Sequence, residues 1–286
     1  MTAQLADPVK LVAEVESRSR RVDTPCGDGT MAWRLWGEAQ AGVAPVVLGH
    51  GGQGSWSHWI RTIDVLSAGR LVIAPDLPGH GDSAMPAAPD HRAIARAIAE
   101  GLHLILGEDN PAEMVGFSFG GVAFAHFAAW FPEKVRRLVL VGSGGLDTPH
   151  GDVRIGRVSG LVGEERRAAI KANLLGLMLH HEASVDELAM HLLIDNARKN
   201  RFEHAQHFVM PDKLALILPG VAVPVAAIWG EFDLPHPDPA LQEAVIRRSH
   251  PSCDFRVIAG AGHWVMYERA DAFNRELVSI LDGPRP

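Results

Sequence analysis

The segment from Gly116 to Gly121 places one hydroxyl-bearing residue, Ser118, among glycines in the order Gly-Phe-Ser-Phe-Gly-Gly. An apolar run precedes it and a helical pattern follows it. A serine in Gly-x-Ser-x-Gly between a strand and a helix lies on a tight turn that exposes its hydroxyl, and small residues on either side leave room for that turn. We predict that Ser118 is a nucleophile. The alternative is an ordinary tight turn in which Ser118 caps the helix.

A serine hydroxyl needs a general base, and that base needs a carboxylate to orient it. The sequence contains 15 histidines, but only His263 follows a glycine directly after the last apolar run. Asp233 comes just after the preceding apolar run. We therefore predict a catalytic triad of Ser118, Asp233 and His263. The carboxylates that compete with Asp233 for the orienting position are Glu231, Asp238 and Asp147.

The attacked carbonyl would also need preorganised N–H donors for its developing negative charge. We assign one donor to the backbone of Phe119, the residue after the nucleophile. We assign the other to Gly52, in the loop His-Gly-Gly-Gln-Gly that follows an early apolar run. The alternative for this loop is a plain glycine-rich turn. Three aromatic residues near these motifs are candidate substrate contacts, although most aromatics simply fill a core: Trp56, Phe117 and Trp264.

Buried strands and helices alternate along most of the chain, which predicts an α/β fold with a mostly parallel sheet. The expected strands lie in 44–52, 70–76, 113–118, 136–144, 223–230 and 253–262. The expected helices are 90–106, 120–131, 238–250 and 268–282. The first part of the chain predicts an antiparallel hairpin at one sheet edge.

The alternation stops between residues 147 and 219, where only helical periodicity is found, as in 164–181 and 185–200. This predicts a helical cap inserted between two strands. We expect residues 1–146 and 220–286 to form the core domain and residues 147–219 to form the cap.

Five motifs occur in the order found in α/β-hydrolase-fold serine hydrolases, and the chain resembles that family. They are HGG (50–52), DLPGHGDS (76–83), GFSFGG (116–121), WGEFD (229–233) and GHW (262–264). The resemblance implies an α/β-hydrolase fold with an eight-stranded, mostly parallel sheet flanked by helices, a Ser-Asp-His triad and no cofactor. It also argues against the haloalkane dehalogenases and epoxide hydrolases, which carry aspartate where this chain has Ser118.

The stretch GHWVMYERADAFNREL (262–277) is similar to the C-terminal part of the meta-cleavage-product hydrolases, which split carbon–carbon bonds. Those enzymes usually carry asparagine before the nucleophile, where this chain has Phe117, and a longer oxyanion loop. They also hold a substrate carboxylate with a cap arginine, for which Arg198 and Arg201 are candidates.

Three functions follow as alternatives. The first is a serine hydrolase of a small carboxylic ester, lactone or related acyl compound, which acts through an acyl-enzyme. The second is a carbon–carbon bond hydrolase of aromatic ring-cleavage products. The third is a hydrolase-fold protein that binds a ligand without turning it over, because a fold alone does not fix function.

The net charge of −7 and the lack of basic runs argue against nucleic acid as a partner. We find no signal peptide and no apolar stretch long enough to span a membrane, and we expect a cytoplasmic protein. The two cysteines lie far apart and are not expected to pair. The histidine spacing in 147–219 fits no metal motif, so we expect no metal. The expected partner is a small-molecule substrate, and a homo-oligomer is possible.

Overall fold

A single eight-stranded sheet forms the centre of the molecule in the order β1-β2-β4-β3-β5-β6-β7-β8. The computed structural model of the protein describes residues 7–202 and 205–284. The strands are β1 (Arg20–Cys26), β2 (Gly29–Trp36), β3 (Val46–Gly49), β4 (Val72–Pro75), β5 (Ala112–Phe117), β6 (Val135–Val141), β7 (Val225–Gly230) and β8 (Asp254–Ile258). β1, β2 and β4 pair antiparallel, and the remaining pairs are parallel. The predicted fold class and edge hairpin are confirmed.

The central strands are continuously apolar because both faces of the sheet are covered. Every residue of β3, β4, β5 and β7 is buried. In the register, Gly49 of β3 lies opposite Gly116 of β5, and Phe117 lies opposite Val141 of β6. The carboxyl ends of these three strands therefore meet at one edge of the sheet, and loops that leave them lie close together.

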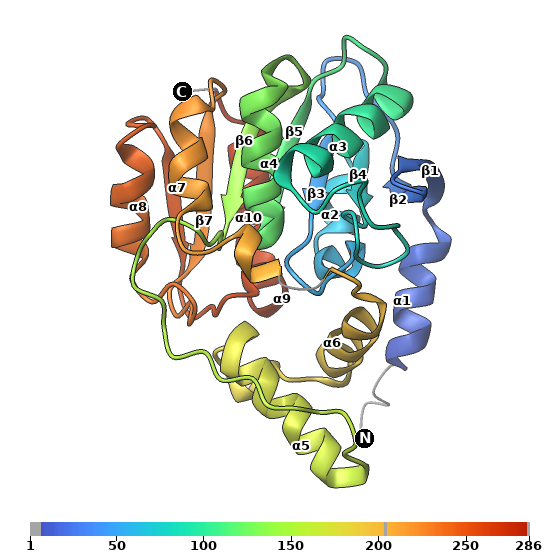
Figure 1. Ribbon diagram of the computed structural model, residues 1–286, viewed down its shortest axis with the longest axis vertical. Coiled ribbons are helices and arrows are strands. Elements are labelled where there is room, and N and C mark those ends of the chain that lie inside the picture. The colour runs from blue at the N-terminus through green and yellow to red at the C-terminus, as the bar shows by residue number, and fades with distance from the viewer. Residues whose placement is uncertain (1–6, 203–204, 285–286) are drawn as a thin grey trace.

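Helices cover both faces of the sheet (Figure 1). Side chains of α3 (His91–Leu106), α4 (Phe119–Trp130) and α8 (Pro239–Arg247) pack in the hydrophobic core on one face. Side chains of α2 (Ile63–Ser67), α9 (Val265–Glu268) and α10 (Ala270–Asp282) pack in a second core cluster. α1 (Pro8–Ser17), which begins after the capping side chain of Asp7, was not predicted.

The segment between β6 and β7 is helical, and no strand occurs among its described residues. Its elements are α5 (Gly163–Asn173), the π-helical turn η3 (Leu174–Met178), η4 (Glu182–Ser184), α6 (Glu187–Lys199), η5 (Ala205–Phe208), α7 (Lys213–Ile217) and η6 (Leu218–Gly220). α5 and α6 lie together beyond the carboxyl edge of the sheet, and α6 also packs next to α1 (Figure 1). α7 instead packs on α4 of the core. The domain limits at residues 147 and 219 stay a prediction.

None of the helices in the described part of the chain combines the length and the apolarity that crossing a bilayer requires.

Candidate active site

Ser118 occupies the turn between β5, which ends at Phe117, and α4, which begins at Phe119. Its backbone has φ 50° and ψ −115°, a conformation that non-glycine residues rarely adopt. Such strain persists only where the surrounding structure holds it, and it is common at functional sites. The N–H of Ser118 donates to the carbonyl oxygen of Val141 on the adjacent β6 at 2.9 Å, which fixes the turn to the sheet.

The glycines around Ser118 are required by close backbone contacts. A Cβ atom at Gly116 would lie 2.5 Å from the Cα of Gly121. A Cβ at Gly120 would lie 2.6 Å from the carbonyl oxygens of Gly49 and His50. These contacts bring the start of α4 against the ends of β5 and β3. The Gly-x-Ser-x-Gly pattern is thus explained by packing as well as by the turn itself.

Asp233 and His263 are hydrogen-bonded to each other. The Nδ1 atom of His263 lies 2.9 Å from Oδ2 of Asp233, and both side chains are buried. Burial by itself would raise the pKa of the Asp233 carboxyl, but the imidazoles of His263 and His236 beside it outweigh that effect and hold the pKa below its usual range. Asp233 therefore stays ionised, and the proton between the two groups belongs to His263 Nδ1. The Nε2 atom of a neutral His263 is then a proton acceptor.

The competing carboxylates lie elsewhere. Glu231 is exposed and accepts a hydrogen bond from the backbone N–H of Gly260 at 2.8 Å. Asp238 caps the N-terminus of α8, and Asp147 is exposed. Of the four candidates, only Asp233 reaches His263.

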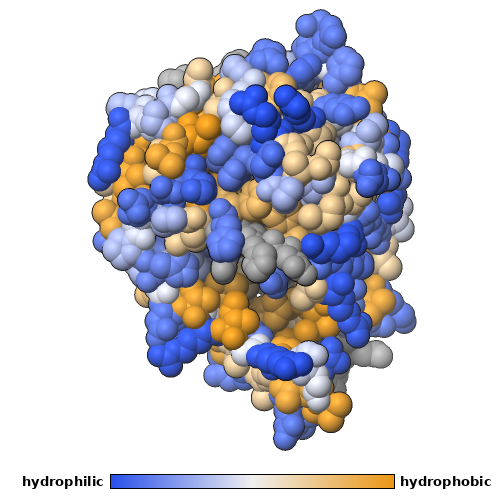
Figure 2. Space-filling view, in the orientation of Figure 1, coloured by the Kyte–Doolittle hydropathy of each residue, from blue (hydrophilic) through white to orange (hydrophobic). Residues whose placement is uncertain are grey.

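Ser118 and His263 line one cavity of about 540 Å³ between the carboxyl edge of the sheet and the helical segment. Hydrophobic residues gather around a hollow in this part of the surface (Figure 2). Aliphatic side chains of the helical segment contribute to the lining, among them Ile155, Leu177, Leu193 and Ile194. The structure brings the predicted nucleophile, the predicted base and an apolar binding space together.

The two predicted oxyanion donors border the same cavity, since Gly52 and Phe119 are both part of its lining. The N–H of Phe119 is at the first position of α4, where helix geometry leaves it without an intrahelical partner. The N–H of Gly51 donates to Nδ1 of His58 at 3.3 Å, whereas among the described residues no hydrogen bond uses the N–H of Gly52. Gly52 and Phe119 therefore have N–H groups available at the cavity.

His50 fixes the loop that carries Gly52. Its Nε2 accepts a hydrogen bond from the N–H of Leu77 at 2.8 Å, so its Nδ1 carries the proton and donates to the carbonyl of Gly51 at 2.7 Å. Burial lowers the pKa of His50 to about 4 and that of the neighbouring His58 well below its usual value. Both are neutral at pH 7, and their hydrogen bonds to the backbone hold the loop in place rather than transfer protons.

Two of the three aromatic candidates lie at the cavity and one does not. Phe117 and Trp264 are part of the lining, and the ring of Phe117 lies 4.8 Å from that of His263. Trp56 is not part of the lining, and this prediction is corrected. Its ring is buried against Trp36 at 5.4 Å, because the short helix η1 (Trp56–Trp59) directs it into the core.

Neither arginine candidate lies at the cavity. Arg198 is exposed near the end of α6. The guanidinium of Arg201 donates to the backbone carbonyls of Gly81 and Ser83. Among the described residues that line the cavity there is no arginine, lysine, aspartate or glutamate.

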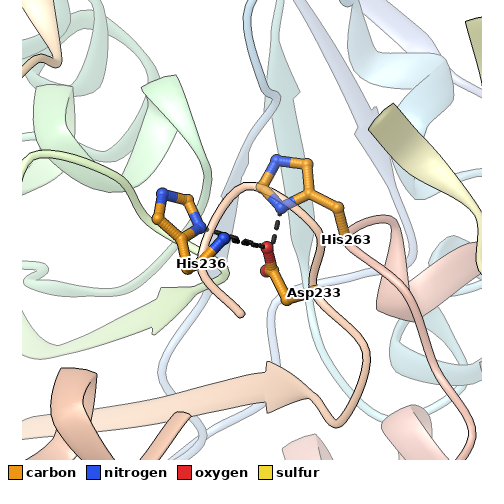
Figure 3. Close-up of side chains that lie close together, drawn as sticks. All are labelled: Asp233, His236 and His263. Atoms are coloured by element: carbon orange, nitrogen blue, oxygen red, sulfur yellow. Dashed lines mark hydrogen bonds and ion pairs between the residues drawn. The ribbon is translucent and has the colours of Figure 1, made fainter. Parts of the chain in front are cut away.

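His236 was missed by the sequence analysis. Its Nδ1 lies 3.1 Å from Oδ1 of Asp233, so Asp233 lies between two imidazoles (Figure 3). The only available signal was the position of a histidine three residues after the predicted acid. Ligand atoms of these three residues lie within 4.8 Å of one another, as in a possible metal site. Each Nδ1, however, is within hydrogen-bond distance of the carboxylate, which is the geometry of proton-sharing pairs.

Both cysteines are free and buried, and burial raises the pKa of Cys26 to about 11 and that of Cys253 to about 12. Neither thiol is activated as a nucleophile.

Comparison with known proteins agrees with the fold and the motif order. A family model described as the alpha/beta hydrolase fold matches residues 44–174. The chain is 31% identical to a 2-hydroxy-6-oxo-6-phenylhexa-2,4-dienoate hydrolase of Burkholderia cepacia, over 85% of this chain and 89% of the relative. It is 29% identical to a 2-hydroxy-6-oxononadienedioate/2-hydroxy-6-oxononatrienedioate hydrolase of Paraburkholderia phymatum, over 94% and 98% of the two chains.

Among solved structures, a putative aryl esterase from Burkholderia cenocepacia superimposes with a TM-score of 0.73 at 24% identity, over 92% of this chain and 98% of that one. These similarities extend over nearly the whole chain, and the relatives named above are hydrolases. The chain is therefore a hydrolase that belongs to the α/β-hydrolase fold family.

Proposed function

We propose that Ser118, His263 and Asp233 act as a catalytic triad that hydrolyses a small carboxylic ester, lactone or related acyl compound. The observation that carries the proposal is the hydrogen-bonded pair of Asp233 and His263, buried beside the cavity that the strained Ser118 turn also lines. No cofactor takes part in this chemistry.

In the proposed mechanism, Asp233 accepts the Nδ1 proton of His263 and so leaves Nε2 to take the proton of the Ser118 hydroxyl. Ser118 attacks the carbonyl carbon, and the N–H groups of Gly52 and Phe119 stabilise the oxyanion, each worth about 10²–10³ in rate. His263 then gives its proton to the leaving alcohol, and an acyl-enzyme remains. Water attacks that ester with His263 again as the base, which releases the acid.

The composition of the cavity favours an uncharged acyl substrate. A dienoate carries a carboxylate, and a buried carboxylate is normally paired with a cation that offsets its lost hydration. The described lining holds no arginine or lysine, and its polar side chains are amides, histidines and Ser118. We infer that a neutral ester or lactone enters this cavity at a lower desolvation cost than a dienoate.

A second candidate function is the hydrolysis of a carbon–carbon bond in an aromatic ring-cleavage product. It is supported by the 31% identity to the Burkholderia cepacia dienoate hydrolase over most of both chains. The same triad would serve, with His263 also moving a proton during ketonisation of the substrate. Against it stand Phe117 beside the nucleophile and the lack of a cation in the described lining.

A direct competition between substrates tests the proposal. We would measure kcat/KM for para-nitrophenyl acetate and butyrate, for a short aliphatic lactone, and for 2-hydroxy-6-oxo-6-phenylhexa-2,4-dienoate, with Ser118→Ala as the control. We expect hydrolysis of an ester or lactone that depends on Ser118 and little turnover of the dienoate. Efficient turnover of the dienoate with poor ester hydrolysis would select the second function. Binding without turnover of any of them would favour a ligand-binding protein.

A further inference from the structure

His236 is held rigidly against the predicted triad acid. Both its backbone N–H and its Nδ1 lie 3.1 Å from Oδ1 of Asp233. The side chain is 5% exposed, and its ring lies 5.6 Å from that of His263. The carboxylate therefore serves two imidazoles, His263 through Oδ2 and His236 through Oδ1 (Figure 3). A role in proton transfer for His263 leaves the second imidazole unexplained.

The unexplained atom is Nε2 of His236. Because Nδ1 lies against a carboxylate oxygen, Nδ1 carries the ring proton, and the Nε2 of a neutral imidazole is an acceptor with a free lone pair. This atom is buried and has no hydrogen-bond partner among the described residues, although His236 lines the cavity. A buried polar atom left without a partner costs about 1–3 kcal/mol.

The residue beside Nε2 on the cavity wall is Gly144, which has no side chain. A Cβ at Gly144 would lie 3.1 Å from Nε2 of His236, so a larger residue there would press on the nitrogen. Gly144 itself lines the cavity. The other titratable groups around His236 are His263 and the exposed His150, whose ring is 6.0 Å away. Neither supplies a hydrogen bond to Nε2.

We propose that His236 is a specificity-determining residue, whose Nε2 accepts a hydrogen bond from a hydroxyl group of the substrate next to the bond that is cleaved. This inference rests on the proposed esterase function and names its substrate class as hydroxylated esters. An acceptor requires a donor, and a hydroxyl is a neutral one. An ammonium group would also donate, but the described lining offers no carboxylate to balance its charge. The short separation of the two rings places this hydroxyl close to the carbonyl that Ser118 attacks.

His236→Asn is the informative variant, because an asparagine amide at this position can still donate to Oδ1 of Asp233 but has no atom at the place of Nε2. The variant would thus largely retain a purely structural role of His236, whereas it would lose the hydrogen bond from a substrate hydroxyl to Nε2. His150→Asn is the matched control, since it removes a different cavity histidine whose Nδ1 is bonded to the carbonyl of Gly151.

The assay uses pairs of esters that differ by one hydroxyl. They are the para-nitrophenyl esters of propionate and lactate, those of butyrate and β-hydroxybutyrate, and propyl and hydroxypropyl butyrate. Comparing the hydroxylated-to-plain ratio of kcat/KM between proteins cancels the intrinsic reactivity of each ester. We expect this ratio, in at least one pair, to fall roughly three- to tenfold in His236→Asn, the effect of one hydrogen bond, and to be kept in His150→Asn.

An unchanged ratio in every pair, or an equal loss on both members of each pair, would overturn the inference while leaving the esterase function in place. If the wild-type protein hydrolyses none of the esters, the proposed function itself fails, and this is seen before any variant is made. If His236→Asn does not fold, the wild type still decides the matter. In at least one pair, the wild-type ratio of kcat/KM for the hydroxylated ester over the plain ester must exceed the ratio of the rates at which hydroxide alone hydrolyses the two esters. A wild-type ratio no larger than that in every pair contradicts the inference.

Discussion

At the scale of single residues, Asp233 is the group on which the site depends, because both of its oxygens accept hydrogen bonds from imidazoles in a fully buried place. An asparagine there would turn its oxygen to the backbone N–H of His236 and its NH₂ to His263, whose Nδ1 would then have to accept, which is the wrong tautomer. We expect Asp233→Asn to keep the fold and to lower kcat for ester hydrolysis by about 10⁴. Glu231→Gln, two residues earlier and exposed, is the control and should behave like the wild type. Equal activity of the two variants would assign the orienting role to another group.

At the scale of elements, the closeness of α4 to β3 positions Ser118. A methyl group at residue 120 would meet two carbonyl oxygens of the β3 end at 2.6 Å, so Gly120→Ala must push the helix away from the sheet. We expect a loss of about 1–3 kcal/mol in the free energy of unfolding, the usual cost of overpacking, together with reduced activity. Gly69→Ala is the control, because a Cβ there meets nothing within 4 Å. Urea unfolding that showed the two variants to be equally stable would contradict this account of the turn.

A second element-scale link joins the helical segment to the loop that carries His263. The buried carboxylate of Glu268 in α9 accepts hydrogen bonds from the backbone N–H groups of His180, His181 and Gly262. Glu268→Ala would leave the buried N–H of Gly262 unpaired, at about 1–3 kcal/mol, and would also remove the acceptor of the part-buried N–H groups of His180 and His181. We expect a lower free energy of unfolding and a lower kcat/KM, measured by urea unfolding and ester hydrolysis.

Glu276→Ala is the matched control for that link, because Glu276 also lies near the end of the chain but forms a partly exposed ion pair with Arg256. Its loss should cost little, as is usual for surface pairs. If Glu268→Ala proved as stable and as active as Glu276→Ala, the link would not hold the two parts together.

At the scale of the whole molecule, buried histidines make stability depend on pH. Burial lowers the pKa of His50 to about 4, of His80 to about 3 and of His126 to about 4, and lowers that of His58 well below its usual value. Below about pH 6.5 the unfolded chain binds protons on these residues that the folded protein does not bind. The free energy of unfolding therefore decreases as the pH is lowered. Asp76, whose pKa burial raises, acts in the opposite direction but is a single group.

We therefore expect the protein to be most stable near neutral pH and to lose roughly 1.4 kcal/mol per pH unit for each additional proton bound on unfolding between about pH 6.5 and 4. Urea unfolding at a series of pH values in this range measures the slope. A free energy of unfolding that stayed constant over the range would show that these histidines are not buried as described.

Much of the fold and part of the site could be predicted because they depend on chain order. β3 to β7 appear as apolar runs in the sequence, and Asp233 and His263 were found because each follows a strand whose carboxyl end lies at the same edge. The predictions that failed concern residues whose role depends on the direction in which the side chain points. Trp56 lies near the right loop, but its ring enters the core. Arg201 stands in the sequence between two cavity residues, Asn200 and Phe202, but its guanidinium donates to backbone carbonyls instead. His236 could not be assigned, because its contact with Asp233 depends on a loop conformation that no periodicity encodes.

The most direct test of the central claim is to label the protein with a fluorophosphonate, which reacts with activated serine nucleophiles, and to locate the adduct by mass spectrometry. It needs no knowledge of the substrate, and Ser118→Ala is the control. We predict one adduct per chain, on Ser118, in the wild type and none in the variant. An adduct on another residue, or an unlabelled folded wild-type protein, would contradict the claim that Ser118 is an activated nucleophile.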